Sequence, residues 1–288
     1  MEEEKTVVEH NFIVKELYPY QKTSIDRIVG RLNQGPNNNN ILFQLPTGGG
    51  KTIIFSHIAR EFIKETNKKV LILTHRIELL HQTSSCLSGI GVDNFVVSSE
   101  VKEVDNPESY GCFIAMVETL NNRLQDDEDF IKNVGLVIVD EAHNNSFRKI
   151  FQYFKNVNML GVTATPLSSN RNLPLNKNYD ELIIGSSISN LVGQNFLCEP
   201  TSYTYDVNLG ALRVGINGDY TVSSSERLYG GFDMQEKLIT AYRERAQGKK
   251  ILIFNPGIRV SWMVYDLSLI HISEPTRRYA ISYAVFCL

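Results

Sequence analysis

The sequence predicts an α/β fold in which a mostly parallel sheet is covered by helices on both faces. Short, nearly continuous apolar runs alternate with helical stretches, which is the composition of parallel strands buried on both faces. A glycine-rich loop joins one of these runs to a helix. The chain has 288 residues, of which 42% are apolar, so it is long enough for a sizeable core and for about two domains.

The elements of the first domain follow from this alternation. A first helix is expected over residues 18–34, and the polar stretch 35–40, which contains glycine, proline and four asparagines, ends it. Five apolar runs are expected to form buried strands. They lie at residues 41–44, 70–73, 112–115, 136–139 and 159–162.

The composition changes near residue 200. We expect the first domain to cover residues 1–200, with a connector at 201–231 that opens on a strand at 201–205 and is then rich in Gly, Ser and Asn. An amphipathic helix is expected from about residue 232, followed by a strand at 249–254 that repeats the basic-then-apolar pattern of 68–73. Residues 232–266 are therefore expected to begin a second α/β domain.

Charge and cysteine content limit the partners and the compartment. The net charge is −3, so a nucleic-acid partner would have to be held by a local surface. The four cysteines are widely spaced and predict neither a metal site nor a disulfide framework. The start is acidic without a signal-like apolar stretch, and no uncharged run reaches the ~20 residues of a membrane span. We expect a cytoplasmic protein with no membrane partner.

Residues 45–52, LPTGGGKT, stand between a strand and a helix, as a P-loop does. The glycines let the backbone N–H groups wrap a phosphate, and Lys51 would reach the β and γ phosphates of ATP while the Thr52 hydroxyl would bind Mg²⁺. The strict pattern has glycine where this chain has Leu45, and a plain glycine-rich turn is the alternative. The remaining candidate phosphate-binding residues are Thr47, Gly48, Gly49 and Gly50.

Two adjacent carboxylates, Asp140 and Glu141, follow the expected strand at 136–139. Open α/β sheets bind ligands at the carboxyl ends of their strands. Asp140 would hold Mg²⁺, and Glu141 would orient and deprotonate the attacking water. An acidic helix start is the alternative. The position of the pair behind an apolar strand and downstream of Lys51 favours the catalytic interpretation.

With these motifs in order, residues 17 to about 200 resemble the first motor domain of the superfamily 2 DEAD/DEAH-box helicases. The resemblance implies a RecA-like P-loop NTPase fold. The segment LYPYQ is similar to the family's element ahead of the P-loop, which implies that Gln21 recognises adenine. LTHRIEL resembles the element that grips the nucleic-acid backbone and VETL the next such element, which implies these contacts for Arg76 and Thr119.

The segment GVTATP at 161–166 matches the family's element that couples hydrolysis to strand movement. The resemblance implies this role for Thr163 and Thr165, and it implies that His143 hydrogen-bonds to that element or to the second domain. Taken alone, the two threonines are ordinary turn hydroxyls and His143 is a structural histidine.

The variants of the motifs resemble bacterial DNA-repair or restriction-type helicases more than RNA-remodelling ones, whose second motif ends in Asp where this chain has His143. The expected function is an ATP-dependent DNA helicase or translocase that uses ATP and Mg²⁺. An RNA helicase, the motor subunit of a restriction enzyme with accessory subunits, and a nucleotide-binding module are the alternatives. A hairpin that contacts DNA is an alternative to a linker at 207–231.

The resemblance also implies a second RecA-like domain that supplies arginines to the ATP site. No arginine-finger pattern follows residue 250, so we expect only the beginning of that domain, weak nucleotide binding and poor hydrolysis. Residues 267–288 resemble a translated sequencing adapter and are expected to be non-native. A native reading frame for that segment at the source locus would contradict this.

Overall fold

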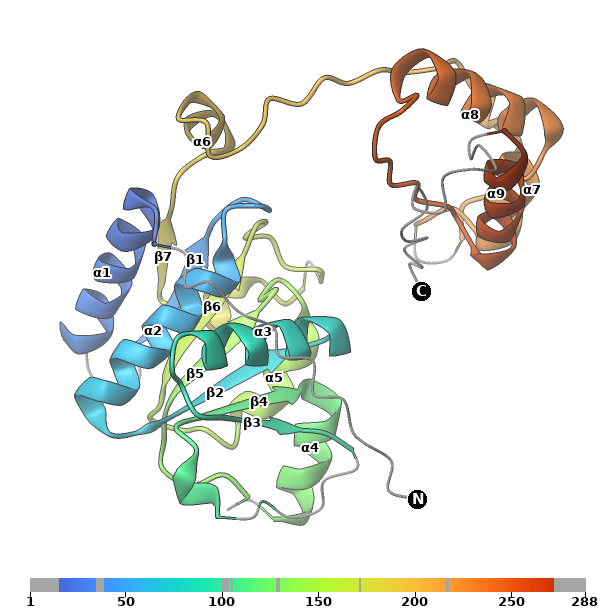
Figure 1. Ribbon diagram of the computed structural model, residues 1–288. Helices are drawn as coiled ribbons and strands as arrows, with labels where there is room; N and C mark the ends of the chain where they lie inside the picture. Colours follow the sequence, from blue (N-terminus) through green and yellow to red (C-terminus); the bar gives the residue numbers. More distant parts are fainter. Residues whose placement is uncertain are drawn as a thin grey trace, which may run out of the picture. The chain divides into compact units, whose positions relative to one another are not determined.

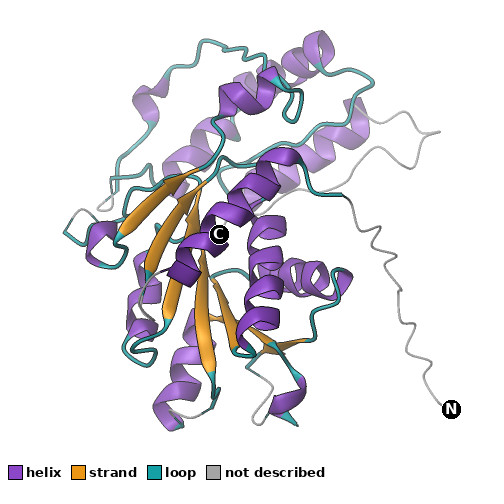
Figure 2. Cartoon of the chain, turned by 90° about the vertical axis from the view of Figure 1, so that its left-hand side faces the viewer, coloured by secondary structure: helices purple, strands orange, loops and turns teal. Residues whose placement is uncertain are grey.

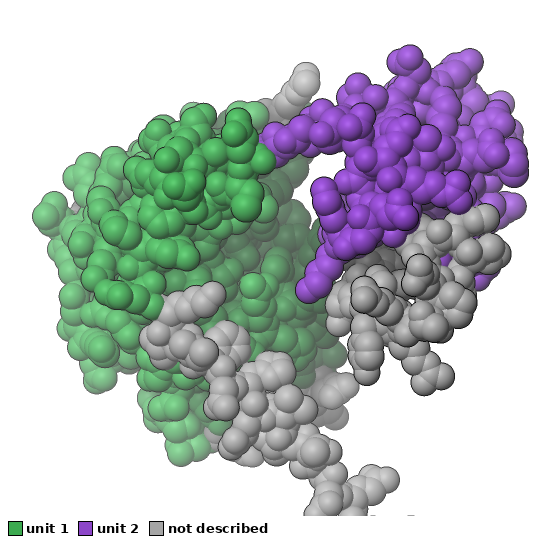
Figure 3. All heavy atoms as spheres, turned by 45° about the horizontal axis from the view of Figure 1, so that its top comes forward, with its two compact units in different colours: residues 1–199 green, residues 200–288 purple. Residues whose placement is uncertain are grey.

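The computed structural model describes residues 16–34, 39–99, 104, 106–127, 130–170, 172–215 and 218–271. The chain divides into two compact units, residues 1–199 and 200–288, which Figure 3 colours separately. Residues 272–288 of the expected adapter-derived tail lie outside the described residues.

The first unit is built on a seven-stranded parallel sheet with the order β3-β4-β2-β5-β6-β1-β7 (Figure 1). This confirms the expected α/β class and each of the five expected strands, while β3 and β7 at the two edges are additional. The strands are β1 (Asn40–Gln44), β2 (Lys69–Thr74), β3 (Asn94–Val97), β4 (Cys112–Met116), β5 (Val134–Asp140), β6 (Asn158–Thr163) and β7 (Glu181–Ile184).

Helices cover both faces of the sheet, as Figure 2 shows. Alternate residues of the strands enter two separate cores because successive side chains of a strand point to opposite faces. In β2, for example, Val70 and Ile72 pack in one core, and Leu71 and Leu73 pack in the other. The first core contains α1 (Pro19–Gln34), α2 (Lys51–Thr66) and α3 (Ile77–Gly89), and the second contains α4 (Val117–Asp126) and α5 (Arg148–Phe151).

Short elements complete the first unit and begin the second. A helix of six residues, α6 (Ile188–Gly193), follows β7. Single turns of 3-10 helix occur at Pro107–Ser109, Asn145–Phe147, Leu175–Lys177 and Leu209–Ala211.

The described part of the second unit contains α7 (Val222–Tyr229), α8 (Phe232–Arg245) and α9 (Ile258–His271). The helix expected from residue 232 is present, but the strands expected at 201–205 and 249–254 were wrong. A strand needs a neighbour for its backbone hydrogen bonds, and the only pairing among the described residues of this unit is an isolated bridge between Val214 and Tyr220. The assignment of residues 232–266 to a second α/β domain stays a prediction.

None of the helices in the described ranges is both long and apolar enough to cross a membrane.

Candidate nucleotide and nucleic-acid site

The motifs identified in the sequence meet at one edge of the sheet, where the parallel strands end. The P-loop follows β1, the Arg76 segment follows β2, the Thr119 segment follows β4, and Asp140 is the last residue of β5. The pairing register puts these strand ends level with one another: Gln44 pairs with Thr163, Leu73 with Val139, and Thr74 with Met116.

The P-loop has the backbone that its glycines allow. Gly48 and Gly50 have φ angles of 83° and 81°, in the left-handed region that residues with a Cβ rarely adopt. The loop is tied to the sheet because the Leu45 N–H donates to the Thr163 carbonyl at 3.0 Å. α2 begins at Lys51, so Lys51 and Thr52 lie in its first turn, beside N–H groups that have no partner within the helix.

Gln21 is buried against this loop. Its Oε1 accepts a hydrogen bond from the Tyr18 N–H at 3.0 Å, and its Nε2 donates to the Tyr20 hydroxyl at 3.5 Å. The Tyr20 hydroxyl in turn donates to the Gly49 carbonyl at 2.9 Å, a contact that sequence reasoning did not find. The recognition of adenine by Gln21 stays a prediction, and it requires the amide to exchange at least one of these partners.

Gly50→Ala is expected to destabilise the fold more than Gly91→Ala. Both glycines have positive φ angles, 81° and 76°, so alanine at either position costs ~1–2 kcal/mol of backbone strain. A Cβ on Gly50 would also lie 2.5 Å from Gln21 Nε2, whereas a Cβ on Gly91 would meet nothing within 4 Å. The displaced Gln21 adds about 1 kcal/mol through its lost hydrogen bond. Urea unfolding of the two variants measures the difference, and equal losses would show that Gln21 is not held against the loop.

Asp140 is a buried carboxylate, with 5% of its surface exposed. Its pKa is raised to about 6, mainly by burial and also by the neighbouring Glu141 charge, while the Glu141 N–H and Lys51 oppose the shift. Glu141 has a φ of 50°, which is strained for a residue with a side chain. The hydrogen bond from the Ala142 N–H to the Val162 carbonyl, at 3.0 Å, holds this turn against β6.

These residues fit a magnesium nucleotide. The loop has no Cβ at the two glycines where a phosphate would approach, and a buried carboxylate lies close enough to Lys51 for the lysine charge to lower its pKa. A buried charge is costly without a partner of opposite sign, and Mg²⁺ is commonly held by one or two protein oxygens together with phosphates. Asp140 and Thr52 are the oxygen donors that would hold the ion, which would neutralise phosphate charge.

Asp140→Asn is expected to stabilise the protein in the absence of nucleotide and Mg²⁺. The folded-state pKa of about 6 lies above the ordinary 3.8, so the folded state binds this proton more tightly than the unfolded state does. The stability that this proton gives to the folded state is lost as the pH rises through 6. The asparagine variant avoids this loss. Its advantage over the wild type should grow from pH 5 to pH 8, to at most about 3 kcal/mol.

Urea unfolding at the two pH values measures this advantage. The control is Asp180→Asn, which replaces an exposed carboxylate and should show no such growth. An Asp140→Asn protein that is less stable than the wild type at pH 8 would contradict the burial cost.

His143 joins the acidic pair to β6. Its Nδ1 lies 3.1 Å from the Thr163 hydroxyl and 3.4 Å from Glu141 Oε2. The Thr163 hydroxyl donates its single hydrogen to the Thr165 carbonyl at 3.0 Å, so His143 Nδ1 must be the donor to Thr163. The expected hydrogen bond from His143 to the 161–166 element is thus confirmed, while the coupling role of His143, Thr163 and Thr165 stays a prediction.

Arg76 and Thr119 follow the neighbouring strands β2 and β4. Arg76 is exposed and immediately precedes α3, and Thr119 is half-buried in the first turn of α4. The fold therefore brings both to the carboxyl edge, and their contact with nucleic acid stays a prediction.

His75 is a polar residue of this edge that sequence reasoning missed. It lies near the acidic pair, because the Glu141 charge acts on its pKa. Its Nδ1 is buried and has no hydrogen-bond partner among the described residues. Burial lowers its pKa, and Arg76 lowers it further, while Glu141 has the opposite effect. The sequence signal for it is the His-Arg pair after an apolar strand, in which the sequence analysis assigned a role to Arg76 alone.

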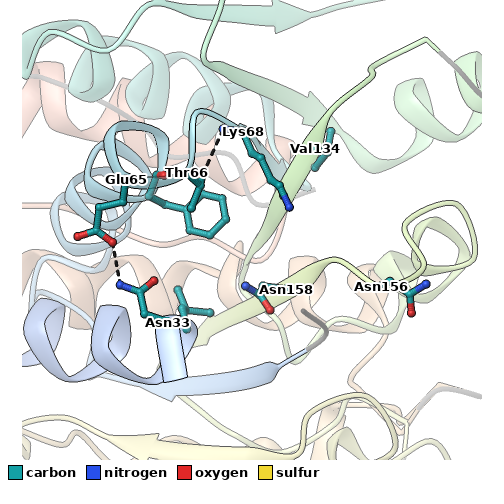
Figure 4. Close-up of a pocket in the computed structure, with 10 residues that line it drawn as sticks. Asn33, Glu65, Thr66, Lys68, Val134, Asn156 and Asn158 are labelled. Atoms are coloured by element: carbon teal, nitrogen blue, oxygen red, sulfur yellow. Dashed lines mark hydrogen bonds between the residues drawn. The ribbon is translucent and has the colours of Figure 1, made fainter. Parts of the chain in front are cut away.

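A polar hollow of about 340 Å³ lies elsewhere on the first unit, near the amino ends of β5 and β6 (Figure 4). Asn33 donates to Glu65 at 2.7 Å and the Lys68 N–H donates to Thr66 at 3.2 Å, so several of its polar groups are already paired. Its lining includes neither the P-loop nor the acidic pair.

Known proteins match the chain as follows. The relative "Putative ATP-dependent helicase IRC3" from Saccharomyces cerevisiae is 29% identical over 253 residues, which is 82% of this chain and 36% of that protein. The "Type I restriction enzyme EcoAI endonuclease subunit" from Escherichia coli is 29% identical over 160 residues, which is 51% of this chain and 19% of that one. The chain thus spans about a third of the length of IRC3 and a fifth of the EcoAI subunit.

The fold also matches solved structures. A nuclease-deletion mutant of the Type ISP restriction-modification enzyme LlaGI, in complex with a DNA substrate mimic, superposes with a TM-score of 0.50 and 17% identity, covering 89% of this chain and 24% of that one. The family model described as "Type III restriction enzyme, res subunit" matches residues 14–168, which include the P-loop and the acidic pair. Because this match covers more than half of the chain, the chain belongs to the family of Type III restriction enzyme res subunits, and it carries a superfamily 2 helicase-type ATPase domain.

Proposed function

We propose that the chain is the first motor domain of an ATP-dependent DNA helicase or translocase. One observation carries the proposal: the P-loop, the acidic pair, Arg76 and Thr119 all follow strands that end at the same edge of the parallel sheet. This arrangement supports the proposal, because a motor needs ATP hydrolysis and contact with a strand side by side if one is to drive the other.

The residues at this edge divide the work. Lys51 and the N–H groups of the loop bind and orient the phosphates, and Thr52 and Asp140 hold Mg²⁺. Glu141 accepts a proton from the attacking water, which leaves the side chain neutral until it releases that proton. Its Oε2 lies 3.4 Å from His143 Nδ1, which contacts the Thr163 hydroxyl and so links this proton acceptor to β6. Arg76 pairs with a backbone phosphate, which does not depend on base sequence and suits movement along a strand.

DNA is the preferred strand on the basis of similar proteins. The names of the relatives include an ATP-dependent helicase and a restriction endonuclease subunit, and the solved relative was bound to a DNA substrate mimic. The motor subunit of a restriction enzyme is the second candidate, because the family model is that of a res subunit. Co-purification of the full-length protein with a nuclease or specificity subunit would favour this candidate over a helicase that acts alone.

Stimulation of ATP hydrolysis tests the proposal. The full-length protein is assayed with no nucleic acid, with single- and double-stranded DNA, and with single-stranded RNA of the same length. We expect at least one DNA form to raise the rate by about tenfold or more, which is a transition-state stabilisation of roughly 1.4 kcal/mol. Equal or greater stimulation by RNA would indicate an RNA helicase. The absence of stimulation by any of them would leave a nucleotide-binding module.

Arg76→Ala tests the strand contact through the affinity for DNA at several salt concentrations. We expect it to weaken DNA binding uniformly across sequences. The slope of the logarithm of the affinity against the logarithm of the salt concentration should fall in magnitude by about one. The control is Lys155→Ala, which removes an exposed cation ahead of β6, at the amino edge of the sheet. Identical salt dependence in the two variants would remove Arg76 from the proposed interface.

A further inference from the structure

The segment that follows β7 returns to the P-loop and is fixed there. α6 ends at Gly193, and Asn195 turns the chain with a φ of 60°. The N–H groups of Phe196 and Leu197 then both donate to the carbonyl of Leu191, at 2.8 and 3.1 Å. Leu191 is fully buried, so these two residues are held in a defined place.

Phe196 packs on the aromatic residues at the start of α1. Its ring centroid lies 4.7 Å from that of Tyr18 and 5.0 Å from that of Tyr20, with the rings tilted against each other. The Tyr20 hydroxyl donates to the Gly49 carbonyl, so only one side chain separates Phe196 from the phosphate loop. The packing joins residues that are more than 170 positions apart in the sequence.

Leu197 contacts the loop directly. A Cβ built on Gly48 would lie 3.0 Å from Leu197 Cδ2, so the leucine methyl group closely covers this glycine. Leu197 therefore contacts the loop at Gly48, and Phe196 is linked to Gly49 through Tyr20. A change in the conformation of the loop has to move this segment or lose these contacts.

These contacts lie close to the end of the first compact unit. The first compact unit ends at Glu199, two residues beyond Leu197. We propose that Phe196 and Leu197 form a latch that ties the chain leaving the first unit to the P-loop, so that filling of the loop is transmitted to the connector. The proposal rests on the proposed function, because it requires phosphate binding at the loop. In it, Phe196 and Leu197 are positioning residues.

A tryptophan at the latch tests the proposal. The sequence contains a single tryptophan, Trp262, so Phe196→Trp in a Trp262→Phe background gives a protein whose one indole is at the latch. The probe is Mg²⁺ with tripolyphosphate, which can fill the phosphate loop but has no base or sugar to contact Phe196. We expect the indole emission to shift and to saturate with the dissociation constant that calorimetry measures for the same probe.

The control places the reporter on the same segment away from the loop. Ile188 is the first residue of α6 and is 58% exposed, so Ile188→Trp in the Trp262→Phe background should show no shift. Calorimetric binding with unchanged emission of the Phe196→Trp protein would overturn the latch while leaving the proposed function intact. The absence of any binding of Mg-ADP and of tripolyphosphate by the wild type would overturn both.

A second pair of variants tests the latch without a reporter. Leu197→Ala removes the contact with Gly48, and Ile188→Ala removes an exposed side chain of similar size. We expect Leu197→Ala to weaken tripolyphosphate binding about fivefold, the lower range of energetic coupling between sites, and Ile188→Ala to leave it unchanged. Equal affinities in the wild type and Leu197→Ala would overturn the proposal.

Discussion

Lys51→Ala is expected to abolish measurable ATP hydrolysis and to weaken the binding of Mg-ADP by roughly 10- to 100-fold, the value of a hydrogen bond to a charged group. The lysine lies in the first turn of α2, directly after the left-handed Gly50, and its charge lowers the pKa of Asp140. Its removal therefore takes a cation from the phosphates and also makes ionisation of the buried carboxylate harder.

Calorimetric titration with Mg-ADP measures the loss of binding, and a steady-state assay measures the loss of ATP hydrolysis. Lys64→Ala is the matched control, because Lys64 is an exposed lysine in the last turn of the same helix. The control should bind and hydrolyse as the wild type does. Unchanged affinity in Lys51→Ala would place the phosphates elsewhere.

Glu141→Gln is expected to lower ATP hydrolysis by about 100-fold or more, the usual contribution of a general base, while leaving nucleotide affinity nearly unchanged. Glutamine keeps the size of the side chain and pays the same backbone strain at φ 50°. It cannot accept a proton from the attacking water. The expected result is thus a loss in kcat without a comparable change in nucleotide binding.

Single-turnover hydrolysis by the full-length protein at saturating DNA, together with Mg-ADP calorimetry, separates these two quantities. Glu181→Gln, at the amino end of β7, is the control and should retain the wild-type rate. Undiminished turnover by Glu141→Gln would contradict the assignment of the base. A loss of affinity without a loss of rate would make Glu141 a binding residue.

The central strands were predictable because each is a short apolar run whose residues are buried on both faces. The edge strands were not, since β3 and β7 have four residues each and expose part of their side chains to solvent, which leaves a weak apolar signal. Residues 249–254 show the opposite case, because a strand was expected there and the structure has none. There the apolar run is present, with Phe254 67% exposed, but a strand also needs a partner that composition does not reveal.

The site shows the same contrast between local sequence patterns and tertiary contacts. The positions of Lys51, Asp140 and Glu141 followed from short motifs, because each motif occupies one loop between two predicted elements. The engagement of the Gln21 amide and the location of His75 near Glu141 depend on packing between distant segments. Such contacts are set by tertiary structure, and no local pattern encodes them.

A crystal structure of the chain with Mg²⁺ and ADP tests the central claim most directly. The expected result is that the phosphates lie in the loop at residues 46–52, with the lysine Nζ of Lys51 on the β phosphate and the ion within reach of Thr52 and Asp140. Nucleotide bound instead in the polar hollow at the amino edge of the sheet, or phosphates that contact neither the loop nor Lys51, would contradict the account.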